Sequence, residues 1–327
     1  MELRGTGRRK PAGTDSDHPI VASLGSYCGR FAPSPTGPLH FGSLVAAMAS
    51  WCDARANGGA WKLRIEDVDA PRTKSGAADA ILTSLERYGF QWDGPVIRQS
   101  ERIASYHAAL DALRGRDQLF ACACTRKELE DAPFGATGER LYPGTCRGGV
   151  PSDRAKRSGR ALRVRVDDRP ITFVDRVQGA QTQVLARDSG DFVVLRADAL
   201  FAYQLAVVVD DAYQGVTHVV RGADLLTSTV RQIWLQRCLG LPTPSYLHHP
   251  IVTSASGEKL SKQTGAAVLP DTPLPVLLDA WTFLEQRAPA ALPDSVESFW
   301  TWAHRAWDPA RMNPRLGAAL PSEARAL

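Results

Sequence analysis

The chain has 327 residues, a formal net charge of +4 at pH 7, 44% hydrophobic residues and 23% charged residues. This length can hold one large or two modest domains with a substantial core, and the composition is ordinary for a soluble globular protein. No apolar run approaches the roughly 20 residues that span a bilayer. The basic stretch 1–17 lacks the apolar segment of a secretory signal, so we expect a disordered leader over residues 1–23 and a cytoplasmic protein.

Strand-like and helical segments alternate from residue 24 to about residue 120. A short apolar strand is predicted over 27–31 and a helix rich in small residues over 40–55. Apolar residues then alternate with charged ones over 61–65, which is typical of a strand, and residues 81–88 form one apolar helical face. This order favours an α/β fold with a parallel, doubly wound sheet.

The middle of the chain, residues 121–194, breaks that alternation and is predicted to be a loop-rich, basic insertion with short strands at 162–166 and 171–174. The apolar run 205–211 is expected to resume the strand–helix pattern within 195–265, the second half of the catalytic domain. A strand at 216–220 and a helix over 228–239 follow. The final segment, 266–327, carries four tryptophans at helical spacing and is expected to form a small helical appendix.

A loop rich in proline joins the first strand to the first helix and reads Arg-Phe-Ala-Pro-Ser-Pro-Thr-Gly-Pro-Leu-His-Phe-Gly-Ser over residues 30–43. Prolines keep the loop out of the helix and Gly37 allows a sharp turn, so backbone donors at the helix start are placed to bind a phosphate. Gly42 leaves room for a flat base, and His40 could stabilise charge on phosphate. Considered alone, a histidine at a helix start is more often structural.

A second string, Lys259-Leu260-Ser261-Lys262, lies in a loop rich in Ser, Gly and Lys about 220 residues later. Two lysines three residues apart could close on the triphosphate of ATP and stabilise the leaving pyrophosphate. Such a short string alone is better explained as a solvated loop. Its pairing with the histidine-containing loop is much more specific.

Together these strings resemble the two signature motifs of class I aminoacyl-tRNA synthetases. Further segments are similar to the glutamate-specific branch: Gly29–Gly37, Arg64–Asp67, Val208–Asp211 and Gly215–Gly222. Ser43 ends the histidine motif as in the shortened members of that branch, the glutamyl-Q tRNA(Asp) synthetases. The resemblance covers about residues 29–265. It implies a Rossmann-like nucleotide-binding fold, activation of L-glutamate by ATP with Mg²⁺, and transfer of glutamate to the wobble queuosine of tRNA(Asp).

The resemblance also implies which residues form the site. Catalytic roles fall to His40, Lys259 and Lys262, since the substrate carboxylate is ionised at pH 7 and needs no general base. ATP would contact Pro33, Gly37, His40, Gly42, Ser43, Lys259, Ser261 and Lys262. Glutamate would contact Arg30, Phe31, Ala32, Pro33, Ser34, Glu66, Tyr203 and Arg221. Arg30 would hold the side-chain carboxylate and Glu66 the ammonium group, and the alternative is a plain salt bridge between these two residues.

Six cysteines in a chain without a signal peptide argue against a disulfide framework. Cys28, Cys52 and Cys238 have apolar neighbours and are expected in the core. Cys122, Cys124 and Cys146 offer three soft metal ligands, although metal-free cysteines remain the alternative. The resemblance adds Tyr142 as a fourth ligand and implies one structural zinc ion in the insertion.

Three other functions are open on the sequence. A conventional glutamyl-tRNA synthetase has the same pocket residues, but only 64 residues follow Gln263, too few for a full anticodon-binding domain. A small-molecule adenylyltransferase shares only the histidine motif, and a zinc-ribbon nucleic-acid-binding module on an inactive core would not need intact His40 or lysines. Residues 140–176 carry ten Lys or Arg against four Asp and could grip tRNA phosphates, or could be a solvated face.

Overall fold

The computed structural model describes residues 26–136, 138–254 and 267–319. The expected leader, 1–23, and the lysine string, 259–262, lie outside these residues. Among the described helices, none is long and apolar enough to cross a lipid bilayer.

The first half of the catalytic fold is a parallel sheet with helical crossovers, as the sequence predicts. Strands β1 (Cys28–Phe31), β2 (Ala60–Ile65) and β3 (Ile97–Arg98) lie side by side in that order. Helix α1 (Phe41–Ala56) joins the first two strands, and α2 (Ala77–Arg87) lies between the second and the third. Both faces of β1 are buried, which explains its continuous apolar character.

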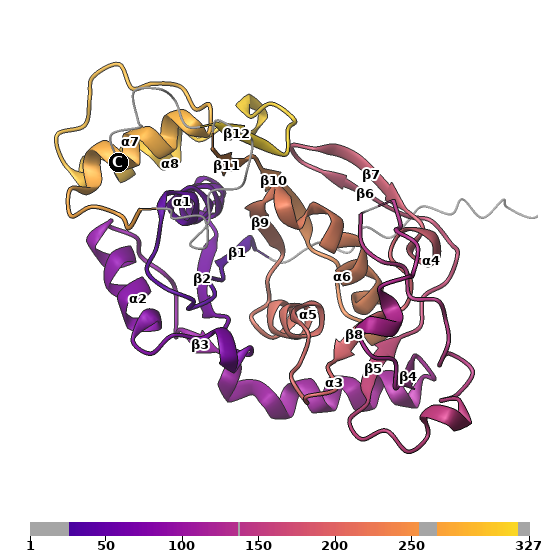
Figure 1. Ribbon diagram of the computed structural model, residues 1–327. Helices are drawn as coiled ribbons and strands as arrows, with labels where there is room; N and C mark the ends of the chain where they lie inside the picture. Colours follow the sequence, from indigo (N-terminus) through magenta and orange to yellow (C-terminus); the bar gives the residue numbers. More distant parts are fainter. Residues whose placement is uncertain (1–25, 137, 255–266, 320–327) are drawn as a thin grey trace, which may run out of the picture.

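Four more strands extend this sheet, two from 195–265 and two, β6 (Ile171–Asp175) and β7 (Gly179–Gln183), from the range expected to form the insertion. Strands β9 (His218–Gly222), β10 (Ser245–His249) and β6 are parallel, and β7 pairs with β6 as a hairpin. Helix α6 (Leu226–Leu239) joins β9 to β10. The Thr217 backbone N–H donates to the Cys28 carbonyl at 2.9 Å, and the Cys28 N–H donates to the Thr217 hydroxyl at 2.8 Å; these two hydrogen bonds hold β1 beside β9. The two halves therefore continue one another, with β1 and β9 at the centre (Figure 1).

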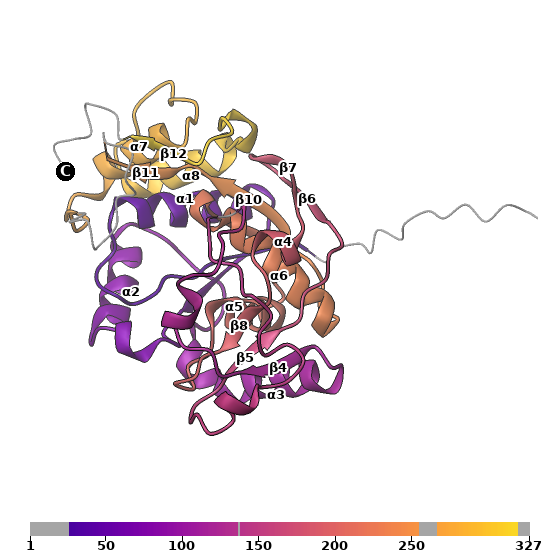
Figure 2. The same ribbon diagram turned by 45° about the vertical axis from the view of Figure 1, so that its right-hand side comes forward.

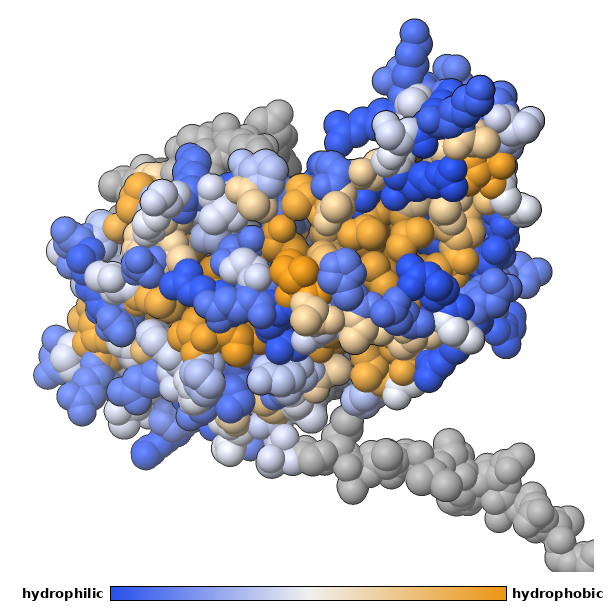
Figure 3. Space-filling model, turned by 90° about the horizontal axis from the view of Figure 1, so that it is seen from below, coloured by the Kyte–Doolittle hydropathy of each residue, from blue (hydrophilic) through white to orange (hydrophobic). Residues whose placement is uncertain are grey.

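A smaller antiparallel sheet lies at one end of the molecule. It contains β4 (Leu119–Cys122), β5 (Ala161–Val164) and β8 (Phe192–Leu195), and helix α3 (Ile103–Gly115) lies beside it in both ribbon views (Figures 1 and 2). Figure 3 shows the molecule from below, the side on which α3 lies in Figure 1. Hydrophobic and hydrophilic residues are interspersed on this face. The short helix α4 (Leu185–Asp188) precedes β8.

The run 205–211 lies within helix α5 (Tyr203–Tyr213) rather than in a strand. Its three valines look strand-like, but residues Leu205 to Val208 are all buried between α3, α6 and β8. A helix buried on most sides has the same continuous apolar pattern as a buried strand, so the pattern does not discriminate between them.

The C-terminal segment packs as two helices on α1, which confirms the expected helical appendix. Helices α7 (Pro273–Phe283) and α8 (Val296–Ala306) bury Trp281 and Trp300, and strands β11 (Ile251–Thr253) and β12 (Gly317–Ala319) pair beside them. The indole of Trp307 donates a 3.0 Å hydrogen bond to Asp53 on α1. Short 3-10 helices occur at Ala70–Arg72, Gln99–Arg102, Lys127–Leu129, Ser152–Arg154, Ala223–Leu225 and Pro309–Arg311.

Candidate active site

A cavity of about 900 Å³ lies where β1, β2, β9 and β10 end. Ligands of open α/β sheets bind at this carboxyl edge because loops from several strands converge there. All eight residues predicted to contact glutamate line the cavity, and so do four of those predicted for ATP, Pro33 being in both sets: Arg30, Phe31, Ala32, Pro33, Ser34, Glu66, Tyr203, Arg221, His40, Gly42 and Ser43.

The Arg30 guanidinium is fixed along one edge. Its Nε donates to Asp211 at 3.2 Å and its Nη1 donates to the Val220 carbonyl at 3.3 Å. No described residue accepts a hydrogen bond from Nη2, so this nitrogen remains for a ligand. Among the described residues, Arg30 and Glu66 do not form the direct salt bridge that was the alternative interpretation of the sequence.

Glu66 instead pairs with Arg64, at 3.1 Å through Oε1, and Arg64 also donates to Asp211 at 2.7 Å. Burial raises the pKa of the Glu66 carboxyl, while the guanidinium groups of Arg64 and Arg30 oppose that rise. Burial also acts against ionisation of Asp211, but the same two guanidiniums hold its pKa below the ordinary value. Arg64 therefore supports both acids from beneath the cavity.

Arg221, at the end of β9, is held by residues that sequence reasoning missed. Its Nε bonds His248 Nε2 at 3.0 Å, and its Nη2 donates to Thr229 at 2.9 Å. Nη1 has only a 3.5 Å contact with the Tyr203 hydroxyl. His248 adjoins the predicted lysine loop in sequence, but nothing in the sequence indicates that it would contact Arg221.

The charges of this cluster match an acidic amino acid. Three guanidiniums, of Arg30, Arg64 and Arg221, stand against the carboxylates of Glu66 and Asp211. The cavity is also lined by Arg72, Lys74 and Asp224, so positive charge is in excess. Glutamate carries one net negative charge at pH 7. The pocket can therefore balance glutamate, whereas neutral glutamine would leave a buried cation unpaired.

The histidine motif lines the same cavity. His40 is the residue before α1, and both its side chain and Gly42 line the cavity. Gly37 is in the same loop, with φ 151°, but is not among the described lining residues. Lys259, Ser261 and Lys262 lie outside the described residues. The described flanks of that string are close by: Val252 lines the cavity, and Val268 pairs with the His40 backbone.

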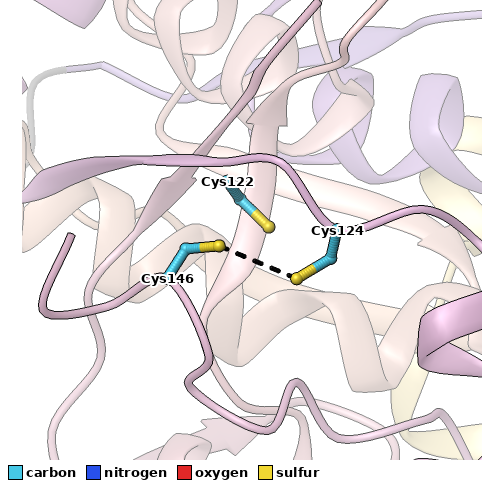
Figure 4. Close-up of side chains that lie close together, drawn as sticks. All are labelled: Cys122, Cys124 and Cys146. Atoms are coloured by element: carbon cyan, nitrogen blue, oxygen red, sulfur yellow. Dashed lines mark hydrogen bonds between the residues drawn. The ribbon is translucent and has the colours of Figure 1, made fainter. Parts of the chain in front are cut away.

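The three cysteines predicted to bind metal converge at the end of β4. The sulfur atoms of Cys122, Cys124 and Cys146 all lie within 4.8 Å of one another and point toward a common centre (Figure 4). The Cys124–Cys146 separation is 3.7 Å. Tetrahedral zinc with Zn–S bonds of about 2.3 Å would place its sulfur ligands roughly 3.8 Å apart. The cluster could hold a metal ion.

The Tyr142 hydroxyl lies 3.4 Å from Cys122 Sγ and 4.0 Å from Cys124 Sγ. It is thus close enough to complete a four-ligand set. Burial and the neighbouring Cys122 raise the pKa of the Tyr142 phenol, so a bound cation would be needed to ionise it. Arg154 Nη1 donates to Cys124 Sγ at 3.1 Å, but burial and the neighbouring Cys122 raise the pKa of the Cys124 thiol to about 11, so a bound cation would be needed to ionise this ligand too.

Most arginines of the basic segment 140–176 form ion pairs or hydrogen bonds with other residues of the protein. Arg154 and Arg157 pair with Glu128, Arg147 pairs with Asp191, and Arg176 pairs with buried Asp53. The segment therefore offers fewer unpaired cations than its composition suggests. Among the described residues, the exposed cations nearest its middle are Lys156 and Arg160, which lie after the 3-10 helix at Ser152–Arg154.

Residues 28–272 match the family model for the catalytic domain of class I tRNA synthetases (E and Q). A Glutamyl-Q tRNA(Asp) synthetase from Aromatoleum aromaticum is 56% identical over 297 residues, covering 90% of this chain and 93% of that protein. One from Dechloromonas aromatica is 56% identical, covering 86% and 94%. The chain belongs to the glutamyl-Q tRNA(Asp) synthetase family of class I synthetases.

A solved structure agrees with this family assignment. The glutamate tRNA ligase of Elizabethkingia meningosepticum, crystallised with its amino acid, superposes with a TM-score of 0.74 at 26% identity, covering 91% of this chain and 68% of that chain. The class I synthetase fold predicted from the two signature motifs is confirmed. Within the glutamyl-Q family, the roles of individual pocket residues stay predictions.

Proposed function

We propose that the protein activates L-glutamate with ATP and transfers the glutamyl group to the queuosine of tRNA(Asp). The observation that carries this proposal is the arginine and carboxylate cluster at the sheet edge, with an excess of positive charge in a cavity of about 900 Å³. The relatives named for this activity, at 56% identity over nearly their whole length, support the choice of acceptor.

In the first step, the α-carboxylate of glutamate attacks the α-phosphorus of ATP. The bond to the bridging oxygen breaks, pyrophosphate leaves, and glutamyl-adenylate forms. Arg30 and Arg221 would bind the two ends of glutamate and Glu66 its ammonium group, which positions the attacking oxygen. His40, Lys259 and Lys262 would stabilise the charge that develops on the phosphates. Mg²⁺, when bound with ATP, supplies further positive charge there.

In the second step, a hydroxyl of queuosine attacks the carbonyl carbon of the adenylate. An ester forms, AMP leaves with the electrons of the broken C–O bond, and the hydroxyl proton passes to solvent or to the phosphate. The cavity is lined on its open side by Arg72 and Lys74, both exposed. We assign this side to the entering nucleotide, because cations there would meet its phosphates.

We further propose that Cys122, Cys124, Tyr142 and Cys146 bind one structural zinc ion. The convergence of three sulfurs and a hydroxyl on one point supports a closed, four-ligand site. Such an ion would fix β4 to the loop that carries Cys146, and thereby stabilise the insertion.

Pyrophosphate exchange into ATP tests the activation step. We expect exchange that depends on L-glutamate and Mg²⁺ and proceeds without tRNA. Glutamine serves as the matched control because it differs only in the charge of its side chain. Exchange with glutamine or aspartate but none with glutamate would refute the assignment of the pocket, and no exchange with any amino acid would favour a nucleic-acid-binding module.

A further inference from the structure

Two edges of the Arg221 guanidinium are fully used by the protein. Nε contacts His248 Nε2 at 3.0 Å, and Nη2 contacts Thr229 Oγ1 at 2.9 Å and the Leu225 carbonyl at 3.5 Å. Nη1, beside Tyr203, is the nitrogen left to bind a substrate carboxylate. The orientation of this nitrogen depends on the groups that hold the other two.

His248 is itself fixed by a buried carboxylate on a different strand. Its Nδ1 lies 2.6 Å from Asp175 Oδ2, and both side chains are fully enclosed. Asp175 also accepts hydrogen bonds from three backbone N–H groups, those of His248 at 3.1 Å, Val177 at 3.0 Å and Gln178 at 2.8 Å. The Asp175 carboxylate is therefore held rigidly at the junction of β6 and β10.

The direction of each hydrogen bond follows from the chemistry. An arginine nitrogen can only donate, so His248 Nε2 must accept and its proton must reside on Nδ1, facing Asp175. Burial lowers the pKa of His248 to about 4, although Asp175 favours the protonated form. The imidazole is thus neutral at pH 7, in the one tautomer that can accept from Arg221.

We infer that Asp175 and His248 are positioning residues for glutamate, acting in series through Arg221. Asp175 selects the tautomer of His248, His248 accepts from Nε, and the guanidinium plane is held with Nη1 toward the cavity. This inference rests on the proposed role of Arg221 in glutamate binding. Asp175 lies 46 residues before Arg221 and 73 residues before His248 in the sequence.

Two variants test the inference in the full chain by pyrophosphate exchange. His248→Leu removes the acceptor for Arg221 and should raise the KM for glutamate about tenfold or more, because a buried donor is left unpaired. His248→Gln keeps an acceptor oxygen and should recover most of that loss. The KM for ATP should stay within about twofold in both, a split that general damage to the fold would not produce.

Asparagine in Asp175→Asn has nearly the same shape as the native aspartate. This variant therefore tests the positioning role if His248→Leu does not fold. It should raise the KM for glutamate and leave that for ATP unchanged. His107→Leu, at an exposed histidine on α3, is the control and should alter neither constant. Unchanged glutamate KM in folded His248→Leu or Asp175→Asn overturns the inference, as does an equal rise in both constants. Wild-type protein that fails to exchange with glutamate would instead refute the proposed function itself.

Discussion

The Asp211 carboxylate joins Arg30 to Arg64: its Oδ1 accepts from Arg30 Nε at 3.2 Å and from Arg64 Nη1 at 2.7 Å. Arg64 is completely buried and never reaches the cavity surface, whereas Arg30 lines it. Arg64 therefore neutralises part of the charge of Asp211, and Asp211 in turn holds the Arg30 guanidinium in place at the cavity. Binding geometry at this site depends on residues below the cavity as well as on those that line it.

Arg30→Lys should impair glutamate activation although the charge is kept. A lysine has no planar fork, so it cannot contact Asp211 and Val220 and still present a nitrogen to glutamate. We expect the KM for glutamate in pyrophosphate exchange to rise about tenfold or more. Arg87→Lys, at a half-exposed arginine on α2, is the matched control. Normal glutamate KM in Arg30→Lys would remove Arg30 from the binding site.

Lys262→Ala should reduce pyrophosphate exchange by more than about tenfold through lost stabilisation of the leaving group. Lys156→Ala removes an exposed lysine from the basic segment and should leave the exchange rate unchanged. If the two variants exchange equally fast, Lys262 has no part in the chemistry.

The cysteine cluster should bind about one zinc ion per chain, measured by elemental analysis. Cys122→Ser should lower both the zinc content and the Tm, because binding free energy at a structural site contributes to folding. Cys238→Ser changes a cysteine outside the cluster and should keep the zinc. Metal-free wild-type protein with the same Tm as Cys122→Ser would leave these cysteines as ordinary buried side chains.

Asp53 should be a major determinant of stability. It is completely buried and pairs with Arg176 at 2.9 Å, with Trp307 and with the Tyr27 hydroxyl. Burial acts to raise the pKa of Asp53, but Arg176 together with these donors holds it below the ordinary 3.8. Removing one charge of a buried pair costs about 3 kcal/mol or more, so Asp53→Asn should lower the free energy of unfolding by about that amount.

The pH dependence of that loss follows from the sign of the pKa shift. A depressed carboxyl pKa stabilises the fold above the unfolded pKa of about 3.9, and the contribution is lost as pH falls through the folded pKa. The gap between wild type and Asp53→Asn, measured by urea unfolding, should be constant from neutral pH to about pH 5 and narrow below pH 4. Asp111→Asn, at an exposed carboxylate, is the control. A gap that widens in acid would contradict this description of Asp53.

Much of this site could be predicted because its residues lie in short strings with recognisable order. Arg30 and Arg221 lie near the ends of β1 and β9, and Glu66 directly follows β2. Parallel strands bring their carboxyl ends together, so these residues meet at one edge of the sheet. Asp175 could not be found in this way. It sits in the range expected to form the insertion, 73 residues before His248, and only the pairing of β6 with β10 brings the two together.

The measurement that tests the central claim most directly is the position of the glutamyl group on tRNA. Radioactive glutamate, ATP and the protein should label queuosine-containing tRNA(Asp), and after nuclease cleavage of the tRNA the label should stay with the anticodon stem-loop fragment and not with the 3′-terminal adenosine. tRNA(Asp) without queuosine and tRNA(Glu) should remain unlabelled. Labelling of the 3′-terminal adenosine of tRNA(Glu) would contradict the account and identify a conventional glutamyl-tRNA synthetase.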